Sequence, residues 1–349
     1  MSNSRWKIWE HPLTGASFTH VMGMLWRNGF GLKPIYIFRI LFILLASAFL
    51  FPFRILEKII FNRKIRAHKL KADPIFIVGH WRSGTTYLHN MFSQDENFGY
   101  MNTFDAFVPD AFIIGKYLIK PFSKLILPSK RPMDTVRIHP DYPQEEEFAV
   151  ASQTSLSFYE CLYFPEQVVD NYAKYIFFET ITEKEKAKCV KTYLFLLKKI
   201  SFAKKGKQLI LKNPINTGRI PALIELYPNA KFVYISRDGG EVLTSTIHMN
   251  SKLLALYSLK DYEEEYIGKF ATDVHAQMIS KYEQDKKKID PKNLVEIKYA
   301  DFVADPVAQM ERIYKQFNLL EFENASVKFQ KYFVEQKNYK PNKFPPNSK

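Results

Sequence analysis

Short apolar runs alternate with helix-like patterns along the chain, and this alternation limits its possible folds more than any other feature. Strands that are buried on both faces read as continuous apolar runs, and the helices between them connect parallel neighbours. We therefore predict an α/β fold of three layers, with a central parallel sheet flanked by helices. The expected strands are 74–79, 208–212, 231–236 and 294–299, and the expected helices are 84–94, 184–200, 217–227, 240–250 and 305–317.

A glycine loop follows the first of these strands and opens a helix. It reads Gly79-His80-Trp81-Arg82-Ser83-Gly84-Thr85-Thr86. Backbone N–H groups in such a loop, together with the helix N-terminus, bind anions. The lysine that a nucleoside triphosphatase carries after the second glycine is replaced here by Thr85, and the cation is Arg82, inside the loop. The pattern predicts a P-loop-like site whose ligand is an anion such as a sulfuryl group, which carries less charge and needs no metal.

A second candidate anion site lies about 150 residues further along the chain. Arg237 ends the strand 231–236, and Ser245 follows eight residues later, about two turns into the next helix. An arginine at a strand end and a serine on the following helix can converge on one phosphate, although the same pair also fits a surface charge and a structural helix serine. A donor molecule with an anion at each end explains why one chain carries both motifs.

Two strings resemble a known family. GHWRSGTTYLHN (79–90) is similar to the 5′-phosphosulfate loop of the sulfotransferase superfamily, in its bacterial branch with Arg before Ser-Gly-Thr-Thr. YISRDGGEVLTSTIHM (234–249) resembles the family's 3′-phosphate motif, but has Asp238-Gly239-Gly240 where proline is common. The resemblance covers about residues 35–345. It implies a transferase that uses 3′-phosphoadenosine-5′-phosphosulfate (PAPS), releases adenosine 3′,5′-bisphosphate and needs no metal. The implied donor-binding residues are His80, Trp81, Arg82, Ser83, Gly84, Thr85, Thr86, Arg237 and Ser245.

The catalytic groups are less clearly marked than the donor site. Sulfuryl transfer needs a cation on the leaving phosphate and a base for the acceptor hydroxyl. Arg82 and Lys212, at the end of strand 208–212, are the candidate cations. The histidine that many relatives carry near Lys212 is absent, so the candidate bases are Glu145 and Glu147, with Glu145 favoured. The alternative is that these glutamates only mark the start of a helix, where the helix dipole favours negative charge. We expect His80 to act as a donor to the sulfate and His89 to be structural.

The N-terminal region is apolar and basic. Residues 34–53 are apolar apart from Arg39, but the uncharged part, 40–53, is shorter than the roughly 20 residues of a spanning helix. Residues 1–72 hold twelve Lys/Arg and two Asp/Glu, so most of the net charge of +14 lies there. We predict that residues 34–71 attach to an anionic membrane surface without crossing it, on the cytoplasmic side. A buried helix and a true span are the alternatives.

Composition adds to the expected acceptor and location. Aromatic residues make up 15% of the chain, which fits either an aromatic core or an apolar acceptor pocket. The predicted acceptor is therefore a hydroxyl of a small lipophilic molecule, sterol-like or a lipid alcohol. The only two cysteines, Cys161 and Cys189, indicate a reducing compartment. Positive charge confined to one end argues against a nucleic-acid partner.

The domain prediction separates residues 1–72, the basic N-terminal region with its apolar helix, from a sulfotransferase domain at 73–349. Within that domain, 100–205 is expected to be an insertion on the acceptor side, irregular over 105–145. The basic string 336–343 either closes over the nucleotide or is a solvated tail. Two other functions stay open: a P-loop nucleotide kinase, which the missing lysine disfavours, and a membrane-attached nucleotide-binding protein without turnover.

Overall fold

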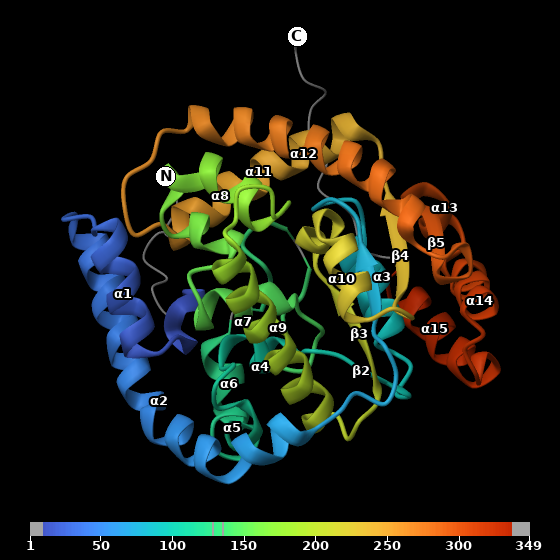
Figure 1. The fold of residues 1–349 in the computed structure, drawn as a ribbon, viewed down its shortest axis with the longest axis horizontal. Helices are drawn as coiled ribbons and strands as arrows, with labels where there is room; N and C mark the ends of the chain where they lie inside the picture. Colours follow the sequence, from blue (N-terminus) through green and yellow to red (C-terminus); the bar gives the residue numbers. More distant parts are fainter. Residues whose placement is uncertain (1–9, 128, 135, 337–349) are drawn as a thin grey trace. The chain divides into compact units, whose positions relative to one another are not determined.

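The computed structural model describes residues 10–127, 129–134 and 136–336 (Figure 1). The chain divides into two compact units. The helical unit comprises Met1–Lys69, Met101–Ala203 and His248–Phe270, and the sheet unit comprises Leu70–Tyr100, Lys204–Ile247 and Ala271–Lys349. The predicted insertion 100–205 nearly coincides with the middle segment of the helical unit, and its role on the acceptor side stays a prediction. The basic string after Gln336 lies outside the described residues.

The sheet unit is built on five parallel strands in the order β2-β3-β1-β4-β5 (Figure 1). The predicted α/β fold with a central parallel sheet is confirmed. The centre of the sheet is apolar because β1, β3 and β4 are buried over most of their length. The strands are β1 (Ile75–Val78), β2 (Phe98–Gly99), β3 (Gln208–Lys212), β4 (Lys231–Ser236) and β5 (Leu294–Lys298).

Helices of the sheet unit cover the sheet with an apolar cluster. The helix α14 begins where expected because Asp305 caps it, accepting a hydrogen bond from the N–H of Ala308 at 3.0 Å, and Pro306 starts its first turn. Its buried side chains and those of α15 pack on the strands, with Phe329 fully buried. The helices wholly within this unit are α3 (Thr85–Phe92), α10 (Ile220–Leu226), α13 (Tyr299–Ala304), α14 (Pro306–Phe317) and α15 (Phe322–Gln336).

The helical unit corrects the expectation of an irregular segment at 105–145. Three short helices occur there because proline and capping residues start helices as well as ending them: Asn102 caps α4, and Pro121 lies in the first turn of α6. The helices of this unit are α1 (Phe18–Asn28), α2 (Pro34–Ala67), α4 (Thr103–Phe107), α5 (Phe112–Leu118), α6 (Lys120–Ile126), α7 (Glu146–Gln153), α8 (Val168–Tyr175) and α9 (Glu183–Ala203). The division between the units falls within α11 (Gly239–Tyr257) and α12 (Glu265–Asp285).

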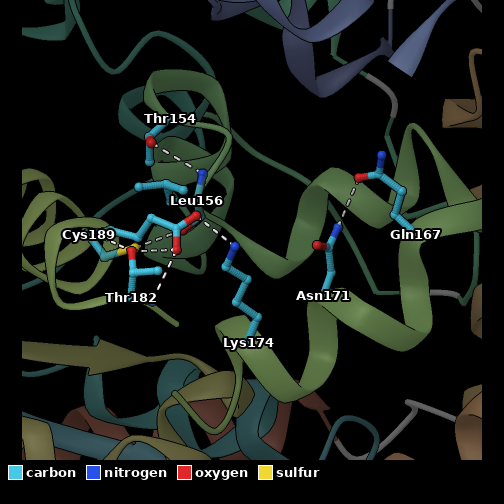
Figure 2. Close-up of polar contacts among 8 residues, drawn as sticks. Thr154, Leu156, Gln167, Asn171, Lys174, Thr182 and Cys189 are labelled. Carbon is cyan, nitrogen blue, oxygen red and sulfur yellow. Dashed lines mark hydrogen bonds and ion pairs between the residues drawn. The ribbon is translucent and has the colours of Figure 1, made fainter. Parts of the chain in front are cut away.

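A capping box fixes the start of α9 (Figure 2). The hydroxyl of Thr182 accepts a hydrogen bond from the N–H of Glu185, and the Glu185 carboxylate accepts one from the N–H of Thr182. Lys174 of α8 also pairs with Glu185 at 2.6 Å, and these contacts lower the pKa of Glu185 to about 2. Cys189, one turn further on, is a buried free thiol that donates to the carbonyl of Leu156. The start of α9 is thus fixed by local polar contacts.

The predicted apolar N-terminal helix is present as α2, and it is longer than the apolar run alone. It has 34 residues, contains Pro52 and continues through the basic residues to Ala67. By length and composition it is able to cross a membrane, and 33% of its most apolar 18-residue window is buried. Proline inside a helix removes one backbone hydrogen bond, and the ribbon of α2 bends along its length (Figure 1).

Candidate active site

The candidate donor-binding residues of the sheet unit meet at one edge of the sheet. The glycine loop follows β1, Lys212 ends β3, and Arg237 follows β4. Because β1 lies between β3 and β4 and all three are parallel, their carboxyl ends lie side by side. Ligands of open parallel sheets bind beyond this edge, where the strand order reverses on either side of β1.

The glycine loop has the backbone conformation of an anion cradle. Gly79, Arg82 and Gly84 have φ of +138°, +70° and +106°. Alternation of left-handed and right-handed residues turns successive N–H groups toward one side of a loop. Ser83 stabilises the turn, because its hydroxyl donates to the carbonyl of His80 at 2.8 Å. The predicted ligand role of the Ser83 hydroxyl therefore requires it to leave this contact or to act as an acceptor.

Gly84 is required by both its conformation and its neighbours. A Cβ at this position would lie 2.3 Å from the Tyr299 ring, and φ of +106° is strained for any other residue. We expect Gly84→Ala to lower the unfolding free energy by about 1–3 kcal/mol and to abolish donor binding. Gly268→Ala is the matched control in a helix, because its Cβ would meet nothing within 4 Å. Denaturant unfolding checks this: equal effects of the two substitutions would contradict it.

Arg82 and Ser245, from the two predicted motifs, are brought together. The Nε of Arg82 donates to the Ser245 Oγ at 2.9 Å, although 163 residues separate them. The Arg82 carbonyl also accepts a hydrogen bond from Nη1 of Arg237 at 3.4 Å. Both candidate anion sites therefore share one side of the sheet edge, as a donor with two anionic ends requires. The individual roles of these residues stay predictions.

Arg237 is held by two neighbours that the sequence did not identify. Its guanidinium lies over the Tyr299 ring, 4.6 Å from the centroid. It also forms an ion pair with Glu241 at 2.6 Å, one turn into α11. The guanidinium of Arg237 is therefore already paired with a carboxylate. The Asp238-Gly239-Gly240 departure from the family pattern leaves Arg237 in place at the end of β4.

His80 is oriented by the main chain. Its Nδ1 donates to the carbonyl of Trp81 at 2.8 Å, since a carbonyl only accepts. Its buried Nε2 contacts no hydrogen-bonding partner within the described part of the chain. Burial lowers the pKa of His80 to about 3, so the ring is neutral and Nε2 is an acceptor. The predicted donor role of His80 therefore requires its protonation. His275 of α12 packs edge-on against this ring, with the two ring centroids 4.9 Å apart, and no sequence pattern indicates this contact.

Three further side chains of the sheet unit, Lys212, His89 and Thr217, are buried at the same end of the sheet. Lys212 is buried at the end of β3. Burial, and to a lesser extent the charge of Lys212, lowers the pKa of His89 well below its usual value. A neutral, fully buried His89 agrees with a structural role. Thr217, which sequence reasoning treated only as a helix start, accepts a hydrogen bond from the Gly79 N–H at 2.8 Å and so anchors the loop. Within the described residues, no group of three or more His, Cys, Asp or Glu is placed to hold a metal.

The candidate carboxylates belong to the helical unit, at the start of α7. Glu145 is the N-cap residue and accepts a hydrogen bond from the Tyr159 hydroxyl, while Glu147 accepts one from Ser157 at 2.7 Å. All three glutamates at 145–147 are buried. A plain helix start would leave such charges in water, so their burial is the unusual feature. Which of them acts as a base stays a prediction.

Glu146, between the two predicted bases, has a carboxyl group with a raised pKa. Burial raises its pKa to about 7, although the Tyr193 hydroxyl donates to it at 2.8 Å and acts to lower the pKa. A carboxyl with a pKa near neutrality is suited to proton transfer. Sequence reasoning missed this residue because its burial follows from tertiary packing alone.

This shift predicts a pH-dependent stability. The folded state binds more protons than the unfolded state between pH 4.5 and 7, so the unfolding free energy should fall as the pH rises through that window. We expect Glu146→Gln to remove up to about 3 kcal/mol of this fall. Glu225→Gln, at an exposed site, should leave the profile as in the wild type. Denaturant unfolding at pH 5 and 7.5 tests the prediction. The same fall in unfolding free energy between the two pH values in all three proteins would refute it.

An apolar pocket lies within the helical unit. It has an empty volume of about 460 Å³, including its open side, and its lining is almost entirely carbon. The Phe158 and Phe270 rings stack on one another with centroids 5.5 Å apart. Such a pocket suits an apolar chain or ring. The lining also includes Leu162, Val168, Leu254 and Ile267.

The central parallel sheet, with an arginine-containing glycine loop and a second arginine–serine pair at the carboxyl ends of its strands, defines an α/β protein. A sequence profile of the Sulfotransferase family matches residues 74–323. The chain belongs to this family, and it is a sulfotransferase. The match includes both motifs and every candidate site residue.

Curated relatives and solved structures agree with this assignment. The omega-hydroxy-beta-dihydromenaquinone-9 sulfotransferases Stf3 of Mycobacterium bovis and Mycobacterium tuberculosis are each 29% identical over 343 residues, covering 98% of this chain and 87% of the relative. The fold is similar to that of sulfotransferase STF1 from Mycobacterium tuberculosis, with TM-score 0.62, 18% identity and coverage of 90% and 86%. STF9 from Mycobacterium avium gives TM-score 0.65, 14% identity and coverage of 93% and 89%.

Proposed function

We propose that this sulfotransferase moves a sulfuryl group from PAPS to the hydroxyl of a lipid alcohol, at the cytoplasmic face of a membrane. The observation that carries the proposal is the contact between Arg82 and Ser245, which unites a phosphosulfate loop and a 3′-phosphate motif at one sheet edge. A nucleotide with a single phosphate chain leaves one of these two anion sites without a function.

The residues of the sheet edge fit the donor. The left-handed glycines and the start of α3 suit the 5′-phosphosulfate, with Trp81, Thr85 and Thr86 beside it. Arg237 and Ser245 suit the 3′-phosphate. In the proposed reaction the acceptor oxygen bonds to sulfur as the bond between sulfur and the bridging phosphate oxygen breaks. Arg82 and Lys212 stabilise the charge left on the phosphate.

The acceptor proton goes to a base, for which we propose Glu145. Its carboxylate is buried and oriented by the Tyr159 hydroxyl, and Glu147 is the second candidate. Glu145→Gln keeps the shape of the side chain and removes its basicity. If Glu145 is the base, Glu145→Gln should lower kcat and leave the donor affinity unchanged. A glutamate with a purely structural role should not show this pattern.

A lipid is the acceptor class that the chain supports best. The apolar pocket of the helical unit suits a hydrocarbon or isoprenoid chain, and the similar Stf3 proteins are named for a menaquinone derivative. A sterol-like alcohol is the alternative acceptor. Transfer of sulfur from [³⁵S]PAPS to a panel of long-chain isoprenoid alcohols, a sterol and a short alcohol tests the class. Labelling of the short alcohol alone would contradict a lipid acceptor.

The ion pair between Arg237 and Glu241 makes a separate prediction about donor affinity. If the carboxylate competes with the 3′-phosphate, Glu241→Gln should tighten binding of adenosine 3′,5′-bisphosphate. Exposed ion pairs are worth about 0.2–1 kcal/mol, so the Kd should fall about 1.5- to 5-fold. Glu283→Gln removes a similar exposed pair with Lys286 and serves as the control. Calorimetric titration decides, and weaker binding by Glu241→Gln would show that this carboxylate positions Arg237.

A further inference from the structure

The helix α2 exposes a stripe of apolar side chains, while Arg39, Arg54 and Glu57 on its opposite side are buried. Residues two apart on a helix lie about 200° apart, so alternating i+3 and i+4 steps define two opposite stripes. The inner stripe, which is buried, holds Tyr36, Ile40, Ile43, Ser47, Leu50, Arg54 and Glu57. The outer stripe, which is exposed, holds Phe38, Leu41, Leu45, Phe49, Pro52, Leu56 and Ile59. A helix at a water-facing surface has the reverse arrangement.

Each charged residue on the buried side of α2 has polar partners within the helical unit. Arg39 donates to the carbonyls of Ala255 and Ser258, both at 2.7 Å. Arg54 donates to the carbonyls of Gly15 and Ala16. Arg54 therefore does not belong to the basic surface, although the sequence places it there.

Glu57 is the third buried charge of α2. Its carboxylate accepts hydrogen bonds from the N–H groups of Ile113 and Ile114 and forms an ion pair with Lys199, which is also buried. These contacts hold the inner stripe of α2 against the helical unit along most of its length. A spanning helix would have to leave all of them for lipid, where unpaired charges are costly.

The segment that carries the outer stripe exposes charge of one sign, and its first lysine, Lys33, pairs with the exposed Asp261 from another segment at 2.5 Å. Glu57 is the only acidic residue between Phe18 and Lys71, and it is buried. Lys58, Arg63 and Lys64 are exposed at the end of the stripe, and Lys33 is exposed at its start. The outer stripe from Phe38 to Ile59 is about 32 Å long at 1.5 Å per residue.

We propose that α2 lies in the plane of an anionic membrane, with its outer stripe in the lipid and its inner stripe fixed to the protein. An apolar stripe bordered by cations, on a helix that exposes no carboxylate of its own, is complementary to acyl chains beneath acidic headgroups. The proposal deepens the membrane part of the proposed function and is independent of the reaction. Both ends of α2 then lie on one side of the bilayer.

Vesicle flotation tests the surface. We expect the wild type to float with vesicles containing anionic phosphatidylglycerol, and less so at high salt or with neutral phosphatidylcholine alone. Leu45→Lys combined with Phe49→Lys should reduce the floated fraction at least tenfold. Leu320→Lys, at an exposed apolar site of the sheet unit, is the matched control and should float as the wild type does. Retained binding of adenosine 3′,5′-bisphosphate shows that a variant is folded. It also distinguishes a loss of membrane binding from a loss of the donor site.

Sidedness distinguishes the in-plane helix from a span. The variants Lys33→Cys and Lys64→Cys should both react with a membrane-impermeant maleimide in inverted vesicles, which expose the cytoplasmic face. Neither should react when the maleimide is added to the outer face of the membrane. Labelling of the two positions from opposite sides would overturn the proposal. It would also be overturned if vesicles fail to bind the wild type while the double variant converts a dimer to a monomer, because the stripe would then be covered by a second copy of the chain.

Discussion

Arg82→Ala should lower kcat about 10²- to 10³-fold, because in the proposed reaction Arg82 stabilises the charge that develops on the leaving phosphate. Arg82 has a left-handed backbone conformation, and its Nε donates to Ser245. The loop and Ser245 together therefore orient its guanidinium. Alanine has the same left-handed cost as arginine, so the backbone of the loop should persist. Single-turnover kinetics with [³⁵S]PAPS measure the chemical step.

Two further substitutions give this prediction its controls. Arg82→Lys keeps the charge but loses the planar fork, and we expect it to recover only part of the rate. Arg312→Ala removes an exposed arginine of the sheet unit and should leave the rate unchanged. If Arg82→Ala keeps the wild-type kcat and only the KM rises, Arg82 binds the donor without stabilising the transition state.

Lys199→Met should lower the unfolding free energy by about 3–5 kcal/mol, because it leaves the Glu57 carboxylate buried without its cation. Lys199 also donates to the carbonyl of Pro109 at 2.5 Å and lies over the Phe112 ring, so it joins α9 to α2 and to the start of α5. Denaturant unfolding at low salt and high salt measures the effect. A buried pair should be almost insensitive to salt.

The neighbouring lysine supplies the control for this substitution. Lys198 is more exposed and contacts only a backbone carbonyl at 3.3 Å among the described hydrogen bonds, so Lys198→Met should change stability by less than about 1 kcal/mol. Replacing both partners, with Glu57→Leu added to Lys199→Met, should recover part of the loss. Equal effects of Lys198→Met and Lys199→Met would contradict a role for the buried pair in holding α2.

The sequence predicts the sheet unit well because its signals are local. Buried parallel strands are continuous apolar runs, and β3 and β4 have the predicted bounds. The glycine loop is equally local, since the two glycines and the following helix start determine its conformation. The sequence pairs Ser245 with Arg237, and its contact with Arg82 is known only from the structure.

Other features depend on packing between distant segments and could not be predicted in the same way. The raised pKa of Glu146 arises from burial, and the ion pair between Glu241 and Arg237 forms where the first turn of α11 follows β4. The polarity of α2 is the clearest case, because an apolar run with scattered charges fits a span, a core helix or a surface helix. Only the partners of Arg39 and Arg54 show which side faces the protein.

The most direct test of the account is the thermal stability of the wild type with adenosine 3′,5′-bisphosphate and, separately, with Mg²⁺-ATP. A ligand at 100 times its Kd stabilises the folded state by about 2.7 kcal/mol. We predict a clear rise in Tm with the bisphosphate, none with Mg²⁺-ATP, and loss of the rise in Arg82→Ala and in Arg237→Ala. A rise with Mg²⁺-ATP and none with the bisphosphate would contradict the proposed donor and favour a nucleotide kinase.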